Sequence, residues 1–135
     1  MIEIIIKLFL RLAIAVGFLS AVADRFGLWS KEFSAWGNWG AFLAYTKTLN
    51  PWLPESLIPA IGIIATIAEV VFAICLIIGF KTKLFAQLSG LLLLLFALSM
   101  TFSIGIKSPL DYSVFTASAA AFALSLMKTG FLEIK

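Results

Sequence analysis

The stretch from Ala65 to Gly79, "ATIAEVVFAICLIIG", places a single carboxylate, Glu69, inside an otherwise almost wholly apolar run. A charge at the centre of a membrane helix costs roughly 2.5–3.5 kcal/mol on insertion scales, so a partner or a function normally keeps it there. The run belongs to a longer apolar span, 57–80, which ends in "GFKTK", a glycine and two lysines typical of a helix end at a membrane surface. This segment predicts a transmembrane helix with a polar site inside it.

The composition of the whole chain points to the same class of protein. Of its 135 residues, 62% are hydrophobic and 13% are charged, whereas soluble domains have about 45–50% apolar and about 25% charged residues. The net charge of +3 is spread along the chain without a basic cluster, which excludes nucleic acid as the partner. We therefore expect one all-α integral membrane domain over residues 1–135.

The absence of several residue types limits the chemistry of the chain. It contains no His and one Cys, Cys75, so His-ligated haem, His-containing zinc sites, a Ser/His nucleophile pair and an internal disulfide are excluded. Cys75 lies in an apolar segment, where a free thiol usually behaves as a small hydrophobe. We expect no metal site and no cofactor held by this chain alone, and we do not expect it to turn over a substrate by itself. Whether it is a subunit of an oxidoreductase stays open.

Four apolar spans predict a four-transmembrane-helix bundle, at residues 4–23, 57–80, 84–106 and 110–127. The first span, with "AVAD" at its end, also resembles a secretory signal cleaved after Ala23, but we expect a retained helix. The fourth begins at "SPLDY", where Pro109 and Asp111 fit a helix start.

Small residues recur every fourth position in two of these spans and predict close helix contacts inside the bundle. They are Ala13, Gly17 and Ala21 in the first span and Ser113, Ala117, Ala121 and Ser125 in the fourth. The alternative is that an alanine-rich helix shows this spacing by chance.

The segment 24–56 is long for a connection and holds all four tryptophans. Trp36, Trp39 and Leu43 would share one face of a short helix, and tryptophan prefers the headgroup level of a membrane. We predict an aromatic interfacial or re-entrant segment. It is either an anchor that packs a lid onto the bundle or the wall of a lipid or quinone pocket.

The distribution of basic residues predicts the orientation. One side of the bundle collects Lys7, Lys81, Lys83, Lys128 and Lys135, and the other collects Arg25, Lys31, Lys47 and Lys107. The bias is slight, but two of these lysines lie in a very short turn, where the positive-inside rule works best. Both termini are expected to be cytoplasmic.

Arg11 is the first candidate for the partner of Glu69, because both lie well inside apolar spans. Their α-carbons should differ in depth by roughly 7–8 Å, which the two side chains can nearly bridge. Lys7 and Arg25 are the other candidates. In a further alternative Arg11 reaches back to the interface, and a protonated Glu69 bonds to a neighbour such as Gln87.

The order of several short motifs resembles the DoxX family of small four-helix bacterial membrane proteins. The matching residues are Arg11 and Gly17 in the first span, Arg25 before Phe-Gly, Glu69, and the turn with Gly79, Lys81, Thr82 and Lys83. The pattern covers the chain to about Met100. Where this chain has Asp24-Arg25, the family often has a Gln-Lys type pair.

The resemblance implies a multi-pass protein of the bacterial cytoplasmic membrane that is a subunit or accessory of a quinone-linked redox system. It implies quinone as the cofactor of that system and a membrane or soluble redox protein as the partner, with a homo-oligomer as a further form. Asp24, Arg25, Trp36, Trp39 and Gln87 are the candidates for its pocket or interface, beside the Arg11/Glu69 pair. Two other functions stay open: a structural or assembly partner without chemistry, and a small lipid-binding or transport protein that uses the polar pair.

Overall fold

The computed structural model describes residues 1–128, 130 and 132–134. Its helices are α1 (Ile2–Arg25), α2 (Trp39–Leu49), the 3-10 turn η1 (Glu55–Leu57), α3 (Ile58–Ile78), α4 (Thr82–Ile104), α5 (Lys107–Asp111) and α6 (Val114–Ser125). Within the described residues the only extended pairing is one isolated bridge, between Phe80 and Ile134. The prediction of an all-helical chain is confirmed.

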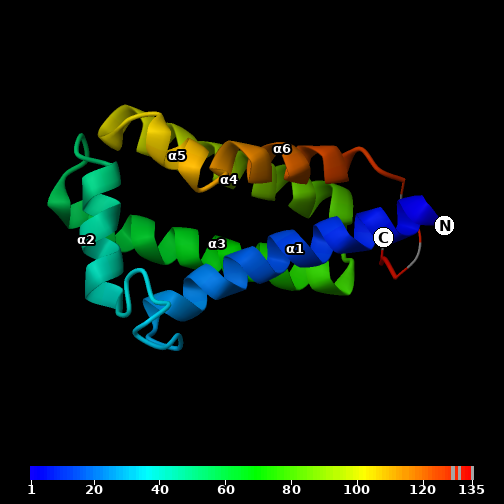
Figure 1. The fold of residues 1–135 in the computed structure, drawn as a ribbon, viewed down its shortest axis with the longest axis horizontal. Helices are drawn as coiled ribbons and strands as arrows, with labels where there is room; N and C mark the ends of the chain where they lie inside the picture. The colour runs from blue at the N-terminus through cyan, green and yellow to red at the C-terminus, as the bar shows by residue number, and fades with distance from the viewer. Residues whose placement is uncertain (129, 131, 135) are drawn as a thin grey trace.

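The long helices form two packed pairs that run side by side (Figure 1). α1 packs on α3, and α4 packs on α6, while α3 and α4 join the two pairs. The short helix α2 lies across one end of the molecule, and the N-terminus and the last described residues lie at the other end (Figure 1). The 24–56 segment and the N-terminus therefore occupy opposite ends of the molecule. Lys135, which we counted with the basic residues of the terminal end, lies outside the described residues.

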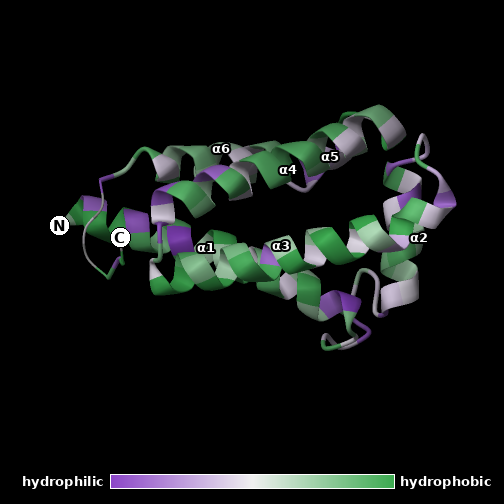
Figure 2. Cartoon of the chain, turned by 180° about the vertical axis from the view of Figure 1, so that it is seen from behind, coloured by the Kyte–Doolittle hydropathy of each residue, from purple (hydrophilic) through white to green (hydrophobic). Residues whose placement is uncertain are grey.

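Two helical segments, Glu55–Ile78 and Thr82–Ile104, are long and apolar enough to cross a membrane. The long helices consist largely of hydrophobic residues (Figure 2). Phe9, Ile64, Leu95 and Phe102 are each more than half exposed. Monomeric soluble proteins rarely expose apolar surface this extensively, so the exposed surface favours a membrane protein.

The ends of the two central helices agree with the predicted spans 57–80 and 84–106 to within two residues. α3 ends at Gly79, whose φ of 77° is the left-handed conformation that glycine adopts without strain. A Cβ at this position would collide with the carbonyl oxygen of Leu132, which belongs to the returning C-terminal segment. Glycine is therefore required here both by conformation and by space.

The prediction of one continuous fourth helix over residues 110–127 is wrong. The chain forms α5 from Lys107, breaks at Tyr112 and Ser113, and resumes as α6. Ser113 has a φ of 56°, and its N–H bonds to the carbonyl of Leu110, so a turn replaces the helix there. Serine side chains compete with helical hydrogen bonds and favour such turns. Pro109 lies within the first turn of α5, where its missing N–H is tolerated.

The two small-residue stripes behave differently. In α6, Ala121 and Ser125 are buried, and Ser118 donates a hydrogen bond to the Gly90 carbonyl of α4 at 2.8 Å. In α1 the stripe does not face the bundle. Ala13 and Gly17 are exposed, and a Cβ at Gly17 would meet nothing within 4 Å.

α1 turns its bulkier side chains inward instead. Ile14 and Phe18 join the buried core, together with Leu76 of α3, Ala86 of α4 and Leu124 of α6. Arg11 and Arg25 are buried on the same side of α1. The larger apolar surface and the need to pair two guanidinium groups determine which face is buried, and they outweigh the small-residue spacing.

Candidate functional site

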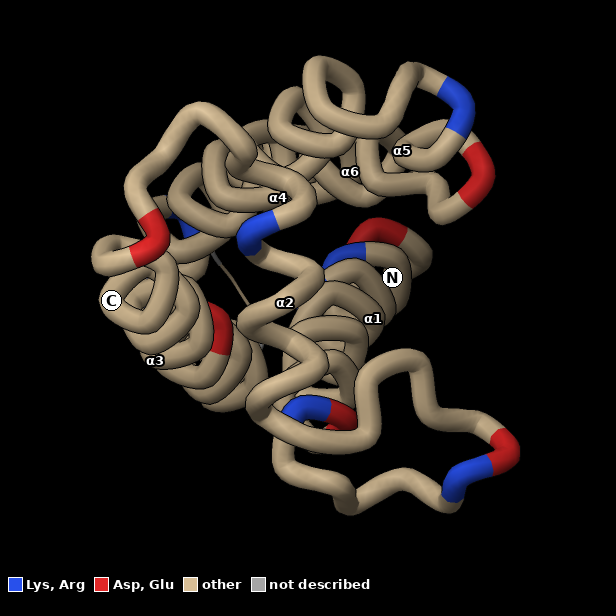
Figure 3. The backbone as a smooth tube through the Cα atoms, turned by 90° about the vertical axis from the view of Figure 1, so that its left-hand side faces the viewer, with Lys and Arg blue, Asp and Glu red and all other residues tan. Residues whose placement is uncertain are grey.

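Glu69 of α3 forms a buried ion pair with Arg25, the last residue of α1. Both side chains are only 3% exposed. The same guanidinium nitrogen, Nη1, also donates to the hydroxyl of Thr66 at 2.8 Å. In a view along the long axis, α1 and α3 lie next to each other (Figure 3). The pair therefore links the C-terminal end of α1 to the middle of α3.

Helix geometry brings Thr66 and Glu69 onto one face of α3, because residues three apart are neighbours on a helix surface. The hydroxyl of Thr66 donates to the carbonyl of Gly62 at 2.7 Å. This bond leaves the oxygen lone pairs available for Arg25. The carboxylate and the hydroxyl thus form a pre-arranged acceptor site for one guanidinium.

Aromatic rings cover the other side of Arg25. Its guanidinium carbon lies 4.0 Å from the ring centre of Phe42 and 5.4 Å from that of Trp36. Cation–π contacts of this kind contribute about 0.5–2 kcal/mol, more when water is excluded. α2 carries Phe42 and packs closely on Gly62 of α3, where a Cβ would lie 2.7 Å from the Leu43 side chain. The absence of a side chain at Gly62 lets the aromatic helix approach.

One donor of this cluster has no acceptor. Nε of Arg25 is buried without a hydrogen-bond partner among the residues that the structure describes. A buried unsatisfied donor costs about 1–3 kcal/mol, and more on a charged group. The Arg25 cluster, defined as Arg25, Glu69, Thr66, Trp36 and Phe42, is therefore a charged site with an unused donor inside an aromatic enclosure.

The predicted pairing of Arg11 with Glu69 is wrong. Arg11 is 1% exposed, and it donates to the carbonyl oxygens of Leu76 and Ile77 at 2.8 and 3.0 Å. The guanidinium of Arg11 thus lies beside Leu76, seven residues or about 10 Å along α3 from Glu69. The last carbonyls of a helix have no intrahelical donors and carry partial negative charge, so they satisfy the guanidinium instead.

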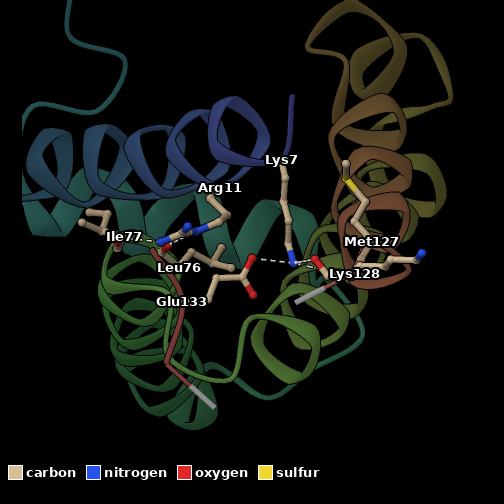
Figure 4. Close-up of polar contacts among 7 residues, drawn as sticks. All are labelled: Lys7, Arg11, Leu76, Ile77, Met127, Lys128 and Glu133. Carbon is tan, nitrogen blue, oxygen red and sulfur yellow. Dashed lines mark hydrogen bonds and ion pairs between the residues drawn. The ribbon is translucent and has the colours of Figure 1, made fainter. Parts of the chain in front are cut away.

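A second polar cluster closes the terminal end of the molecule (Figure 4). Lys7 of α1 forms an ion pair with Glu133 at 2.5 Å and donates to the carbonyl of Lys128 at 2.6 Å. Next to it, the N–H of Ile134 donates to the Gly79 carbonyl at 2.6 Å, and the N–H of Lys81 donates to the Ile134 carbonyl at 3.0 Å. Residues 132–134, here called the C-terminal strap, are thereby fastened across the α3–α4 turn.

Asp24 organises the loop that leads into α2. Its carboxylate accepts the hydroxyl of Ser34 at 2.5 Å and the backbone N–H groups of Ala35, Trp36 and Gly37 at 2.8, 3.2 and 3.1 Å. Burial raises the pKa of this carboxyl, but the four hydrogen bonds outweigh burial and lower the pKa below its ordinary value of 3.8. Asp24 therefore holds Trp36 in place over Arg25.

Trp36 and Trp39 are half-buried, but they do not share one helix as predicted. α2 begins at Trp39, because the side chain of Asn38 accepts the Ala41 N–H at 2.7 Å and caps the helix there. Trp36 therefore reaches Phe42 from the preceding loop, at 5.1 Å between ring centres. Trp39 stacks on Phe26 at 5.6 Å.

Two surface pockets contain the remaining predicted residues. A pocket of about 470 Å³ is lined by Asp24, Trp36, Trp29, Phe33, Ala35 and the α1 residues Gly17, Ser20 and Ala21. A second pocket, of about 330 Å³, contains Gln87 with Lys81, Thr82, Lys83, Leu84, Glu133 and Ile134. Gln87 thus lies in the first turns of α4, at the end of the molecule that holds the N-terminus. No hydrogen bond joins it to Glu69 among the described residues.

The sequence analysis missed two members of the Arg25 cluster. Thr66 lies three residues before Glu69, and Phe42 lies three residues after Trp39. Helical spacing places each on the face of its neighbour, so this signal was present in the sequence. Within the described part of the chain, no three Cys, Asp or Glu side chains lie close enough together to hold a metal ion.

Comparison with protein-family models, with curated proteins and with solved structures found no match for this chain. A function is therefore inferred from the geometry of the chain itself.

Proposed function

We propose that this chain is a small four-span membrane protein that binds the head of a quinone-type amphiphile at the Arg25 cluster, as an accessory of a membrane redox system. The observation that supports this function most directly is the buried Nε of Arg25, which has no partner among the described residues. A quinone carbonyl oxygen is the kind of acceptor this donor lacks, and the adjacent rings offer flat apolar surface to a quinone ring.

In this proposal α1, α3, α4 and the α5–α6 segment each cross the bilayer. α6 alone, with 12 residues, is about 18 Å long and too short for a bilayer core of about 30 Å, so α5 must complete the fourth span. The lysine-rich end of the molecule faces the cytoplasm of a bacterial cell. This end carries Lys7, Lys81, Lys83 and Lys128. α2 and the tryptophans then lie at the level of the outer headgroups.

The placement of the Arg25 cluster agrees with a ligand that comes from the bilayer. The cluster shares Trp36 with the 470 Å³ pocket, whose walls are mainly aromatic and small apolar residues. Binding pockets for small molecules are typically about 300–1,000 Å³ and mainly apolar, with few polar groups. The chain supplies a donor and a shaped enclosure, while electron transfer requires a redox partner protein.

A structural or assembly role is the second candidate, and one observation favours it. The Arg25–Glu69 pair and the Arg11 bonds both join α1 to α3, so the buried charges also fix the register of the two helices. A buried polar group can be kept for register alone.

A solvent extract of the purified chain separates these candidates. Wild type should carry quinone in a fixed molar ratio, and Phe42→Leu, which keeps the ion pair but removes the ring over Arg25, should lose most of it. Phe102→Leu is the matched control, because Phe102 is 75% exposed on α4. Extracts of wild type without quinone would exclude this proposal; a reproducible lipid would favour lipid binding or transport, and an empty extract would favour the structural role.

A further inference from the structure

The pocket at the start of α4 lies at the opposite end of the molecule from the Arg25 cluster, and the proposed function does not use it. Its volume is about 330 Å³. Lys81, Thr82 and Lys83 form one wall, and Glu133 and Ile134 of the C-terminal strap form the other. Gln87 lies about one helical turn further along α4.

Backbone donors at the start of α4 are available to a ligand. Phe85 is the first residue whose N–H bonds to a carbonyl of the helix start, that of Lys81, and no side chain caps the helix. The N–H groups of Thr82, Lys83 and Leu84 are therefore the unpaired donors that every helix N-terminus presents. These N–H groups and the helix dipole favour an anion, above all a phosphate.

A second, independent observation also points to a ligand. Thr82 lines the pocket and is 4% exposed, yet its hydroxyl has no hydrogen-bond partner among the residues that the structure describes. Buried hydroxyls are normally paired. The oxygen of an anion beside the unpaired N–H groups would supply the missing acceptor.

The charges around the pocket also favour an anion. Lys81 and Lys83 are exposed at its rim. Glu133 is the acidic residue among those that line it, and Lys7 neutralises this carboxylate at 2.5 Å from outside the pocket wall. The balance of charge facing the pocket is therefore positive.

We propose that the start of α4, with Thr82, Lys81 and Lys83, is a binding site for a phosphate group, closed on one side by the C-terminal strap. The phosphate belongs either to the headgroup of an anionic lipid or to a free phosphate ion. Both offer the same oxygens to the N–H groups and the lysines.

The test measures binding of two probes to the full chain in a neutral detergent at constant ionic strength. The probes are inorganic phosphate and dihexanoyl phosphatidylglycerol, with dihexanoylglycerol as the lipid without phosphate. Dissociation constants are taken from the concentration dependence of the unfolding temperature. The variants are Thr82→Val, Lys83→Gln and their combination, and the matched control is Lys31→Gln, which removes one charge at the opposite end.

At least one phosphate probe should raise the unfolding temperature of wild type, while dihexanoylglycerol should not. Binding should weaken at least tenfold in the combined variant and stay unchanged in Lys31→Gln. Phosphatidylglycerol acting alone would assign the phosphate to a lipid headgroup, and inorganic phosphate acting as well would assign the site to phosphate itself.

Thr82→Val also separates binding from a structural role. Because its hydroxyl bonds to nothing in the described chain, the unliganded variant should unfold at the wild-type temperature or above. Failure of both probes to stabilise folded wild type, or equal binding in the combined variant, would overturn the proposal. Neither result depends on whether quinone is extracted with the chain.

Discussion

Two arginines on one helix show how a buried charge can be satisfied in different ways. Arg25 faces a carboxylate, a hydroxyl and two rings. Arg11 donates to backbone carbonyls at the end of α3. Removal of Arg25 therefore leaves a buried anion behind, whereas removal of Arg11 leaves only uncharged carbonyls of α3 without a side-chain donor.

A double-mutant cycle on Arg25→Met and Glu69→Gln should show strong coupling. Each single change leaves an uncompensated buried group and should lower the free energy of unfolding by about 3–5 kcal/mol, while the double variant should lose less than the sum. The measurement is reversible unfolding in detergent. The matched cycle on Arg11→Met and Glu69→Gln should be additive to within about 0.5 kcal/mol, because those side chains do not meet. Stronger coupling to Arg11 than to Arg25 would contradict the pairing described here.

The ion-pair partner of Glu69 was difficult to predict because the sequence does not give the axial offset between two helices. Hydropathy shows that Arg11 and Glu69 both lie inside apolar spans. Their relative depth, however, depends on how far α1 extends beyond the end of α3, and that follows from side-chain packing across the interface. Arg25 was one of the alternative partners, and the observed offset of the two helices brings it to Glu69.

At the scale of the elements, the loop between α1 and α2 depends on one side chain. Asp24 accepts four hydrogen bonds from residues 34–37, and it thereby fixes the ring of Trp36 against Arg25. Residues 26–38 form turns and bends without a regular helix or strand, so the loop should loosen if the carboxylate were neutralised.

The stability that Asp24 contributes should depend on pH. Its pKa is lower in the folded chain than its ordinary value of 3.8, so the contribution is complete above about pH 3.8 and is lost as the pH falls through the lower, folded value. Unfolding temperatures of wild type and Asp24→Asn, followed from pH 7 to pH 2, should differ most at neutral pH and converge in acid. The difference between the two proteins removes the titration of the other acids. A gap that stays constant down to pH 2 would show that the carboxylate does not anchor the loop.

The central helices were predictable to within two residues because their ends carry strong local signals, a glycine with two lysines after α3 and a long uninterrupted apolar run in α4. The break between α5 and α6 was not. Both sides of the break are apolar. The left-handed residue is Ser113, so the glycine that usually marks such a turn in a sequence is missing. The short helix α2 was expected, but its start at Trp39 followed from the capping bond of Asn38.

At the scale of the whole molecule, the two ends differ in chemistry. The end with α2 is aromatic, and the end with the termini is rich in lysine. The helices between the two ends are mainly hydrophobic (Figure 2) and carry many exposed apolar side chains, which matches the lipid-facing belt of the proposed membrane arrangement.

Labelling of single cysteines from outside intact cells should show this arrangement. In a Cys75→Ala background, Glu32→Cys should react with a membrane-impermeant maleimide, and Lys83→Cys should react only after the membrane is permeabilised. Both positions are exposed, so differences in reactivity should report the side of the membrane. Reaction at position 83 with none at position 32 would reverse the orientation.

The bond between Lys7 and the carbonyl of Lys128 spans 121 residues, and this separation affects how the chain is made. At about 5–20 residues per second, a ribosome needs on the order of 10 s to synthesise the second partner after the first. In the proposed membrane arrangement, α1 would by then lie in the membrane with a lysine whose acceptors have not yet been translated, and Arg25 would have no partner until α3 is made. The first helix to be inserted would therefore be the last whose charged side chains gain their partners. An insertase or the lipid headgroups must shield its charges during biogenesis, and nascent chains truncated before residue 128 should be the ones most readily degraded by membrane proteases.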